Sequence, residues 1–131
     1  MPETLWESPT PSSAFAHGVA LANLPRRECE LAFWVEDGDD WSRRSLIFEA
    51  VIAYKCTHLP SLKPSMVKAA HDKVVSLKYS AWLRDSLPKA RKFFRGQGRT
   101  TPHLRHLVVS FDQGPCYEFI CEGFRAVASP A

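Results

Sequence analysis

The chain has 131 residues, 45% of them hydrophobic and eight of them phenylalanine, which is enough to build the core of one ordinary domain. Its formal net charge is only +3, so bulk charge alone does not indicate a nucleic-acid-binding protein. No apolar run approaches the roughly 20 residues of a membrane helix, and no basic segment followed by an apolar one marks a signal peptide, so we expect a cytoplasmic protein without a membrane partner.

The first 24 residues hold three prolines and three serines and follow neither the helical nor the strand period. We expect residues 1–24 to form an N-terminal arm, which is either mobile or lies across the body with Trp6 and Phe15 as anchors. Residues 25–131 are then expected to form a single domain.

Two segments alternate apolar and polar residues, as strands do. The first is residues 30–36, and the Asp- and Gly-containing segment 37–40 ends it. The second is residues 45–57, which we expect to form one long strand. One face of that strand is expected in the core and carries Leu46, Phe48, Ala50, Ile52, Tyr54 and Cys56.

Helical spacing begins at Pro64, a residue that suits a first helical turn, and continues to about residue 86. Apolar residues recur there at steps of three and four, namely Val67, Ala70, Val74, Leu77 and Ala81. Pro88 is expected to interrupt the helix, and residues 89–95 are expected to form a short second helix that ends at Gly96.

Two β-rich runs flank a Gly-Pro turn at residues 112–115 and predict a hairpin within residues 104–127. We expect a three-residue loop, because that register separates apolar from polar side chains. The apolar face then pairs Phe111 with Tyr117, Val109 with Phe119 and Leu107 with Cys121. The other face pairs Val108 with Ile120, Ser110 with Glu118 and His106 with Glu122.

The predicted order of elements is β-β-α-α-β-β, with a hairpin on either side of the helical region. We therefore predict the α+β class, with an antiparallel sheet of about four strands and the long helix packed on one face. The apolar face of the C-terminal hairpin is expected to lie against that helix, since this arrangement buries both apolar surfaces.

Charge is segregated along the chain. Residues 28–40 hold six acidic and no basic residues, whereas residues 89–105 hold six basic and no acidic residues. Such segments form solvated faces, pair with each other, or steer a complementary partner. The candidate partner-binding residues are Asp37, Asp39, Asp40, Lys89, Arg91, Lys92, Arg95 and Arg99.

The basic segment 89–105 also admits nucleic-acid binding, because Arg and Lys neutralise phosphates and Phe93 or Phe94 would stack on a base. However, two adjacent phenylalanines in a short helix are more often core residues. The Gly-Gln-Gly sequence that follows them lacks the Lys-Ser/Thr ending of a phosphate-binding loop. We therefore expect a protein partner first and a nucleic acid only as a less favoured alternative.

Catalysis is an alternative function, by a small enzyme with a carboxylate- or cysteine-based site near the C-terminal hairpin. Glu49 and Glu118 fall on the mostly polar sides of two strands, and they would form an acid and base pair if those strands were neighbours. His106 and Asp112 are the other candidate catalytic residues. None of them forms an evident triad with a serine or a cysteine.

The sequence predicts no metal site and no cofactor. The four cysteines lack a CxxC pair, so we expect free thiols in a reducing compartment. His103 and His106 are three apart on a predicted strand, which places them on opposite faces. The acids around Gly38 lack the ligand order of an EF-hand. We therefore predict a small domain that binds a macromolecular partner, above all another protein, as a regulator, an inhibitor or an immunity-type protein does.

Overall fold

The computed structural model describes residues 2–9, 12, 18–58, 64–78, 80–111 and 115–128. The elements in chain order are β1 (Glu3–Glu7), β2 (Ala20–Leu24), the 3₁₀ turn η1 (Pro25–Arg27), β3 (Glu28–Asp37), β4 (Asp40–Glu49), β5 (Ala53–Thr57), α2 (Pro64–Ala70), β6 (Lys73–Leu77), α3 (Ala81–Gly96), β7 (Arg105–Ser110), β8 (Cys116–Cys121) and β9 (Gly123–Ala128). The predicted α+β class is confirmed, but the single sheet of about four strands is wrong.

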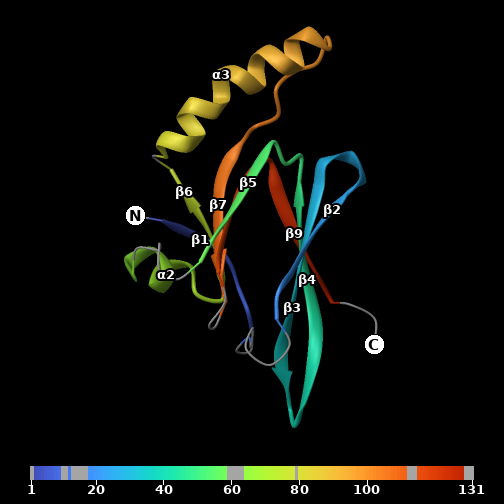
Figure 1. The fold of residues 1–131 in the computed structure, drawn as a ribbon, viewed down its shortest axis with the longest axis vertical. Coiled ribbons are helices and arrows are strands. Elements are labelled where there is room, and N and C mark those ends of the chain that lie inside the picture. The colour runs from blue at the N-terminus through green and yellow to red at the C-terminus, as the bar shows by residue number, and fades with distance from the viewer. Residues whose placement is uncertain are drawn as a thin grey trace.

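The described strands form two antiparallel sheets. One has five strands in the order β1-β6-β7-β8-β5, and the other has four in the order β2-β3-β4-β9. Figure 1 shows the sheets extending along the long axis of the molecule, with α3 across one end and the β3–β4 turn at the other. The acidic residues of the β3–β4 turn and the basic residues of α3 therefore lie at opposite ends.

The main core lies between the two sheets. Phe48 of β4 stacks on Phe119 of β8 with ring centroids 3.9 Å apart, and Phe33 stacks on Phe111 at 4.5 Å. The inner face of the five-stranded sheet contributes Val74, Leu107, Val109, Tyr117, Phe119 and Cys121. The predicted apolar face of the hairpin is thus confirmed. Its expected contact with the long helix is wrong, because the second sheet covers this face.

The register of the C-terminal hairpin differs from the predicted one by two residues. Val109 lies opposite Tyr117, and His106 lies opposite Ile120. Because side chains alternate with a period of two, this shift keeps each side chain on its predicted face and changes only its partner. The loop that sets the register, residues 112–114, lies outside the described residues.

The predicted strand 45–57 divides at Ala50. This residue has a φ of 51°, in the left-handed region, so the chain leaves the four-stranded sheet there and enters the other sheet as β5. Leu46 and Phe48 lie in the core as predicted, but Tyr54 and Cys56 are exposed. The face prediction is therefore wrong beyond the break, because the strand changes sheets.

The long helix predicted from Pro64 to about residue 86 is also wrong. After α2 the chain turns at Asp72, whose φ is 54°, and continues as β6 between β1 and β7. Val74 and Val75 of β6 are fully buried in two different core clusters. A strand buried on both faces loses the alternation by which strands are recognised. The expected break at Pro88 and short second helix are wrong as well, because α3 runs through Pro88.

Residues 1–24 contribute two strands, although their composition favours neither helix nor strand. β1 pairs with β6, and β2 pairs with β3. Trp6 packs edge-on against Phe33 with ring centroids 6.0 Å apart, which is a contact expected of a segment that lies on the body. Phe15 lies outside the described residues. The division into an arm and a domain at residue 25 stays a prediction.

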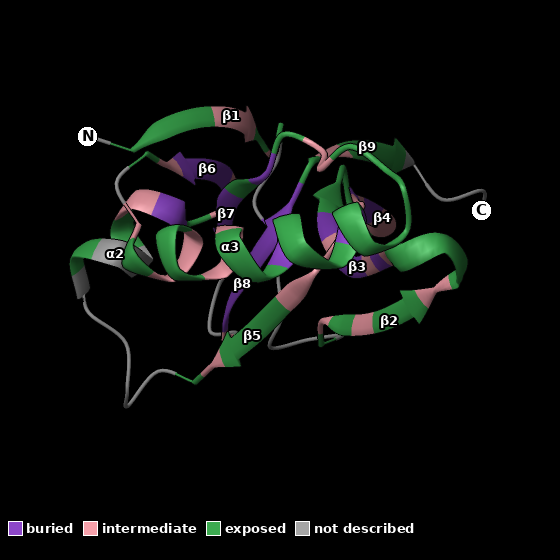
Figure 2. Cartoon of the chain, turned by 90° about the horizontal axis from the view of Figure 1, so that it is seen from above, coloured by how far each residue is buried: buried purple, intermediate pink, exposed green. Residues whose placement is uncertain are grey.

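The helices cover the outer face of the five-stranded sheet. Ala70 of α2 packs with Val75 and Val108, and Phe94 of α3 packs with Ile120. Figure 2 shows α3 lying over β8, which is buried along its length. None of the helices in the described ranges is long and apolar enough to cross a membrane.

Candidate functional site

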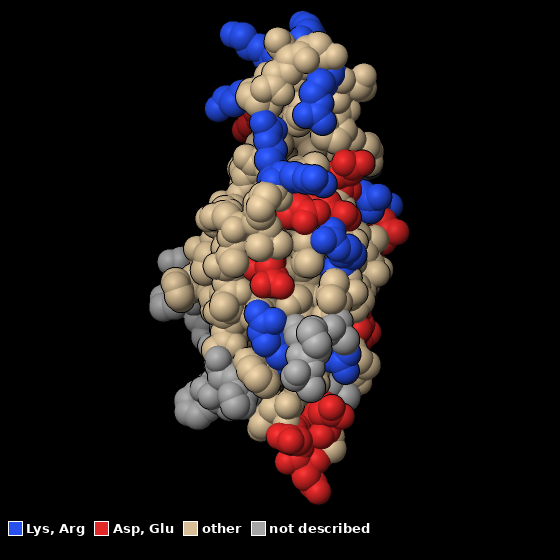
Figure 3. All heavy atoms as spheres, turned by 90° about the vertical axis from the view of Figure 1, so that its right-hand side faces the viewer, with Lys and Arg blue, Asp and Glu red and all other residues tan. Residues whose placement is uncertain are grey.

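Five exposed cations define the end of the molecule that α3 occupies. They are Lys89, Arg91, Lys92, Arg95 and Arg99, and we call them the basic face. Figure 3 shows Lys and Arg gathered at this end and Asp and Glu gathered at the opposite end. Among the described residues, no acidic side chain forms an ion pair with any of the five. The structure thus places the predicted cations at one end of the molecule, on α3 and just beyond it.

The acidic candidates Asp37, Asp39 and Asp40 are exposed at the turn between β3 and β4. Gly38 has a φ of 64° there, a conformation that glycine adopts at little cost in a tight turn. This turn is at the far end of the molecule from α3 (Figure 1). The acidic and basic sets therefore do not neutralise each other.

A groove lies between α3 and residues 51–53, which lead into β5. Its cavity has a volume of about 580 Å³, and its walls include the apolar side chains of Ile52, Trp82 and Phe93. Its charged lining residues are Arg27 and Lys89. The groove is therefore an apolar depression with one cation from each side, next to the basic face.

Arg27 forms the sheet side of this groove because of an unusual backbone. Arg26 and Arg27 have φ values of 63° and 59°, a conformation that is uncommon for residues other than glycine. The carbonyl of Arg27 accepts a hydrogen bond from the Val51 N–H at 2.8 Å, which ties η1 to the strand crossing. The Arg27 guanidinium lies 4.4 Å from the ring centre of Phe93 and 5.4 Å from that of Phe94. These cation–π contacts hold the side chain against α3.

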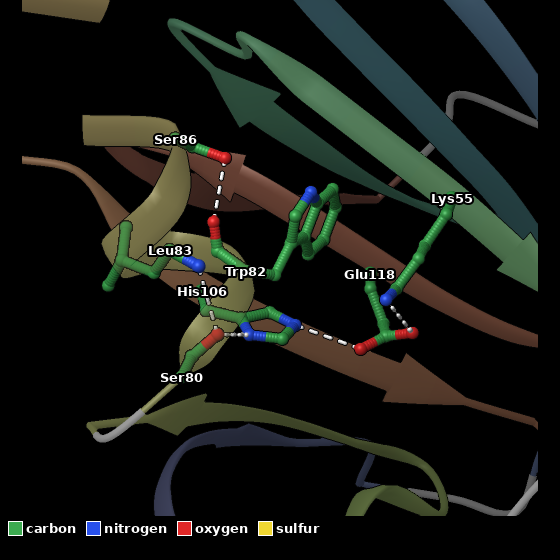
Figure 4. A network of polar contacts seen from close by, with 7 residues as sticks. All are labelled: Lys55, Ser80, Trp82, Leu83, Ser86, His106 and Glu118. Carbon is green, nitrogen blue, oxygen red and sulfur yellow. Dashed lines mark hydrogen bonds and ion pairs between the residues drawn. The ribbon is translucent and has the colours of Figure 1, made fainter. Parts of the chain in front are cut away.

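A polar network lies under the N-terminal end of α3 (Figure 4). His106 of β7 bonds Ser80 through Nδ1 at 2.6 Å and Glu118 of β8 through Nε2 at 2.9 Å. The other oxygen of Glu118 lies 3.7 Å from Lys55 Nζ of β5. His106 and Glu118 are only 4% and 9% exposed. The structure therefore brings together two of the four predicted catalytic candidates and adds Ser80 and Lys55.

Hydrogen bonding assigns the protons of this network. Burial raises the pKa of Glu118, but the hydrogen bond from His106 and the charge of Lys55 outweigh it, so the pKa lies below its ordinary value. An ionised carboxylate only accepts, so His106 Nε2–H donates to it. In the neutral imidazole, Nδ1 accepts from the Ser80 hydroxyl, whose oxygen accepts from the Leu83 N–H at 3.1 Å. All these groups have partners.

Trp82 connects the network to the groove. Its ring meets the His106 ring edge-on with centroids 5.1 Å apart, and Lys55 Nζ lies 4.5 Å from the centre of the Trp82 ring. Trp82 is also one of the groove walls. The buried network therefore positions the first turn of α3 and one side of the groove.

The other catalytic candidates lie elsewhere. Glu49 is in the four-stranded sheet and bonds Arg125 at 3.0 Å, so it does not share a site with Glu118. Asp112 lies outside the described residues. Ser80 is the N-cap of α3, and its oxygen is already used to accept the Leu83 N–H. These contacts support a structural role for the network more directly than a catalytic one.

The cysteines are free thiols, three of them buried and Cys56 exposed. Burial raises the pKa of Cys116 and of Cys121 to about 12, so their thiolate forms are scarce near neutral pH. The two thiols in the C-terminal hairpin are therefore poor nucleophiles. In the part of the chain that the structure describes, no group of three or more His, Cys, Asp or Glu side chains is arranged to hold a metal.

Sequence reasoning missed Arg27, Lys55, Ser80 and Trp82. A serine before a helical segment indicates an N-cap, but the spacing of residues 64–86 predicts one continuous helix, so Ser80 did not stand at a predicted helix start. The other three residues meet only through the packing of α3 on the sheet, which has no local signal in the sequence.

No protein-family model, no curated protein and no solved structure matches this chain. Its function is therefore inferred from the residues of the site itself.

Proposed function

We propose that this chain is a binding domain that docks an acidic surface of a protein partner through the basic face. The observation that supports this most is that five cations are exposed at one end of the molecule and form no ion pair with a described acidic residue. Cations gathered on one surface attract a complementary acidic surface and speed its association. A regulator, an inhibitor or an immunity-type protein would act by such docking.

Two features favour a protein over a nucleic acid as the partner. Phe93 is the exposed ring among these cations, and the Arg27 guanidinium lies over it, which leaves less of the ring for stacking on a base. The groove beside it has mostly apolar walls, which are typical of the centre of a protein interface. The acidic turn at the other end stays a separate predicted contact.

Charge reversal on the basic face tests the proposal. Arg91 and Arg95 are exposed and do not line the groove, so Arg91→Glu/Arg95→Glu should leave the fold intact. Wild type and variant would capture proteins from a lysate of the source cell, and each captured protein would be purified for kinetic measurements. We expect the association rate constant to fall by about tenfold or more, with a smaller change in dissociation, because surface charge mainly steers the encounter.

The matched control reverses two exposed cations elsewhere, as Lys68→Glu/Lys78→Glu, and changes the net charge by the same amount. This control should leave association within about threefold of wild type at physiological salt, where charges beyond the Debye length are screened. An equal loss in both variants would show that net charge matters and not this surface. A partner that binds both variants like wild type would contradict the proposal.

Oligonucleotide binding separates the nucleic-acid alternative. Labelled single- and double-stranded oligonucleotides of mixed sequence would be titrated at about 0.15 M salt, near physiological screening. Micromolar or tighter binding that is lost in Arg91→Glu/Arg95→Glu would contradict a protein partner. Such binding would also weaken by roughly a factor of 10³ or more between about 50 and 200 mM salt for six phosphate contacts.

A further inference from the structure

We infer that the groove between α3 and residues 51–53 binds a linear segment of the partner that carries one aromatic or large aliphatic side chain beside a carboxylate. The inference rests on the proposed protein-binding function. It names the part of the partner that this end of the molecule would recognise, and it uses residues distinct from Arg91 and Arg95.

The groove has the size and the walls of a binding site. Its volume of about 580 Å³ lies within the range of roughly 300–1,000 Å³ that is typical of pockets for small ligands. Phe93 is 43% exposed, and among the described residues the only other exposed large hydrophobic residues are Tyr54 and Val127. An apolar side chain that entered the groove would remove Phe93, Ile52 and Trp82 from water. The walls therefore select an aromatic or large aliphatic anchor.

The cations of the groove select a carboxylate beside that anchor. Lys89 projects from α3 and Arg27 comes from η1, so they approach the groove from its two sides. Neither forms an ion pair with an acidic side chain in the described ranges. A guanidinium that lies over a ring keeps its outward N–H groups for a carboxylate in its own plane. Arg27 can therefore hold Phe93 and a carboxylate at once.

The surface around Arg27 is long enough for an extended segment. Arg27 also borders two neighbouring cavities of about 300 and 420 Å³. The first includes the exposed Tyr54 and also Glu28, which is paired with Arg125, and the second adds Arg26 and Arg99 together with Glu122. Apolar surface therefore continues on both sides of the groove and further cations on one side, which suits a linear peptide better than a single small molecule.

A second copy of this chain is the main competing occupant. Its own acidic turn at residues 37–40 is followed by Trp41, which has the required chemistry. However, that turn lies at the opposite end of the molecule (Figure 1), so each contact would join one end to the other. Moreover, Trp41 is half-buried and paired with Glu36 in the β3–β4 ladder, so it does not offer the extended segment that the groove would bind. We therefore assign the groove to a different protein.

The test uses phage-displayed random peptides of about 12 residues, a length suited to a linear recognition motif. Peptides would be selected on wild-type protein and then synthesised with a fluorescent label. We expect the selected peptides to share an aromatic or large aliphatic residue within about two positions of Asp or Glu, since the apolar walls and the two cations are adjacent. Amide shift changes in wild-type protein should map their contacts to the groove.

Variants on one helix supply the matched comparison. Lys89→Glu and Phe93→Ala should each weaken peptide binding by about tenfold or more, because each removes one element of recognition. Arg84→Glu makes the same charge change at an exposed residue of the same helix, outside both the groove lining and the basic face, and it should weaken binding by less than about threefold at about 0.15 M salt. Circular dichroism would check that each variant is folded. If one groove variant does not fold, the other variant and the map of amide shift changes in wild-type protein test whether peptides bind in the groove.

Three outcomes would overturn the inference. They are selected peptides without acidic residues, affinities that neither groove variant changes, and self-association of the protein that Lys89→Glu abolishes, which would make a second copy the occupant. The two proposals fail separately. Partner capture that needs Arg91 and Arg95 but not Lys89 or Phe93 would refute only the groove. The docking proposal alone would be refuted if acidic peptides bind in a way that depends on Lys89 and Phe93, but no captured partner depends on Arg91 and Arg95.

Discussion

The two faces of the five-stranded sheet are both buried, but their chemistry differs. The inner face packs rings and aliphatic side chains, such as Phe119 stacked on Phe48, against the second sheet. The outer face, under the helices, mixes Val108 and Ile120 with His106 and Glu118, all at most 9% exposed. A mixed face is therefore not always a solvated one. Polar groups can be buried when each of them has a hydrogen-bonding partner.

This difference predicts that the two faces stabilise the fold through different interactions. The inner face should depend on buried area and packing, because its members have no polar partners to lose. The outer face should depend on partners that come from α3 and β5, since a buried polar group without a partner is costly. Substitutions on each face can test this, and the expected effects decrease in the order below.

The largest effect is expected for Phe119→Ala on the inner face. The substitution leaves a cavity beneath Phe48 and should lower the free energy of unfolding by about 3–5 kcal/mol. Urea denaturation would measure it. Phe93→Ala on the surface is the control, with an expected loss of less than about 1 kcal/mol. A loss below about 1 kcal/mol for Phe119→Ala would show that the inner face is not the main core.

An intermediate effect is expected for Glu118→Gln on the outer face. The amide keeps the shape but removes the charge that His106 and Lys55 contact, so the loss should be about 1–3 kcal/mol at neutral pH. Glu30→Gln is the control, because Glu30 pairs with Arg43 at 3.7 Å near the surface, where such a pair contributes about 0–1 kcal/mol. Equal losses in the two variants would contradict a special role for the outer face.

The same variant should change how stability depends on pH. The pKa of Glu118 in the folded protein lies below its ordinary value of 4.5, so its charge stabilises the fold above that value. This contribution is lost as pH falls through the folded pKa. The difference in unfolding free energy between wild type and Glu118→Gln should therefore be largest near neutral pH and shrink as the pH is lowered below 4.5 and through the folded pKa. A difference that stays constant over this range would mean that the carboxylate charge is not the cause.

The smallest effect is expected for Ser80→Ala, at the boundary between the outer face and α3. It removes the N-cap bond to Leu83 and the bond to His106 and should cost about 1 kcal/mol. Ser80→Thr keeps the hydroxyl and should cost less. If the two variants unfold at the same urea concentration, the hydroxyl does not link α3 to the sheet.

The predictions succeeded where a segment has one buried face. Residues 30–36 became part of β3, and the hairpin placed Leu107, Val109 and Phe119 together in the core. An alternating pattern contains enough information for this, because it states which side chains share a face. It does not show which element covers that face. In this protein the second sheet covers the apolar face of the hairpin, and the helix does not.

The predictions failed where both faces are buried or where a single residue turns the chain. Val74 and Val75 are apolar neighbours in a central strand, so their spacing imitates a helix. Ala50 looks like any strand residue, yet its positive φ moves the chain from one sheet to the other. The partners that stabilise these conformations come from distant parts of the chain, which local patterns do not encode.

The candidate site divides in the same way. The order of residues alone determined that six cations without an acid follow one another at 89–105, because charge is a property of each side chain. Only the tertiary structure decided that α3 places one of these cations, Lys89, in a groove with Arg27 and residues 51–53. It also decided that His106 meets Glu118 and Ser80, which are 12 and 26 positions away. Such contacts depend on how elements pack, since burial and hydrogen bonding act through space and not along the chain.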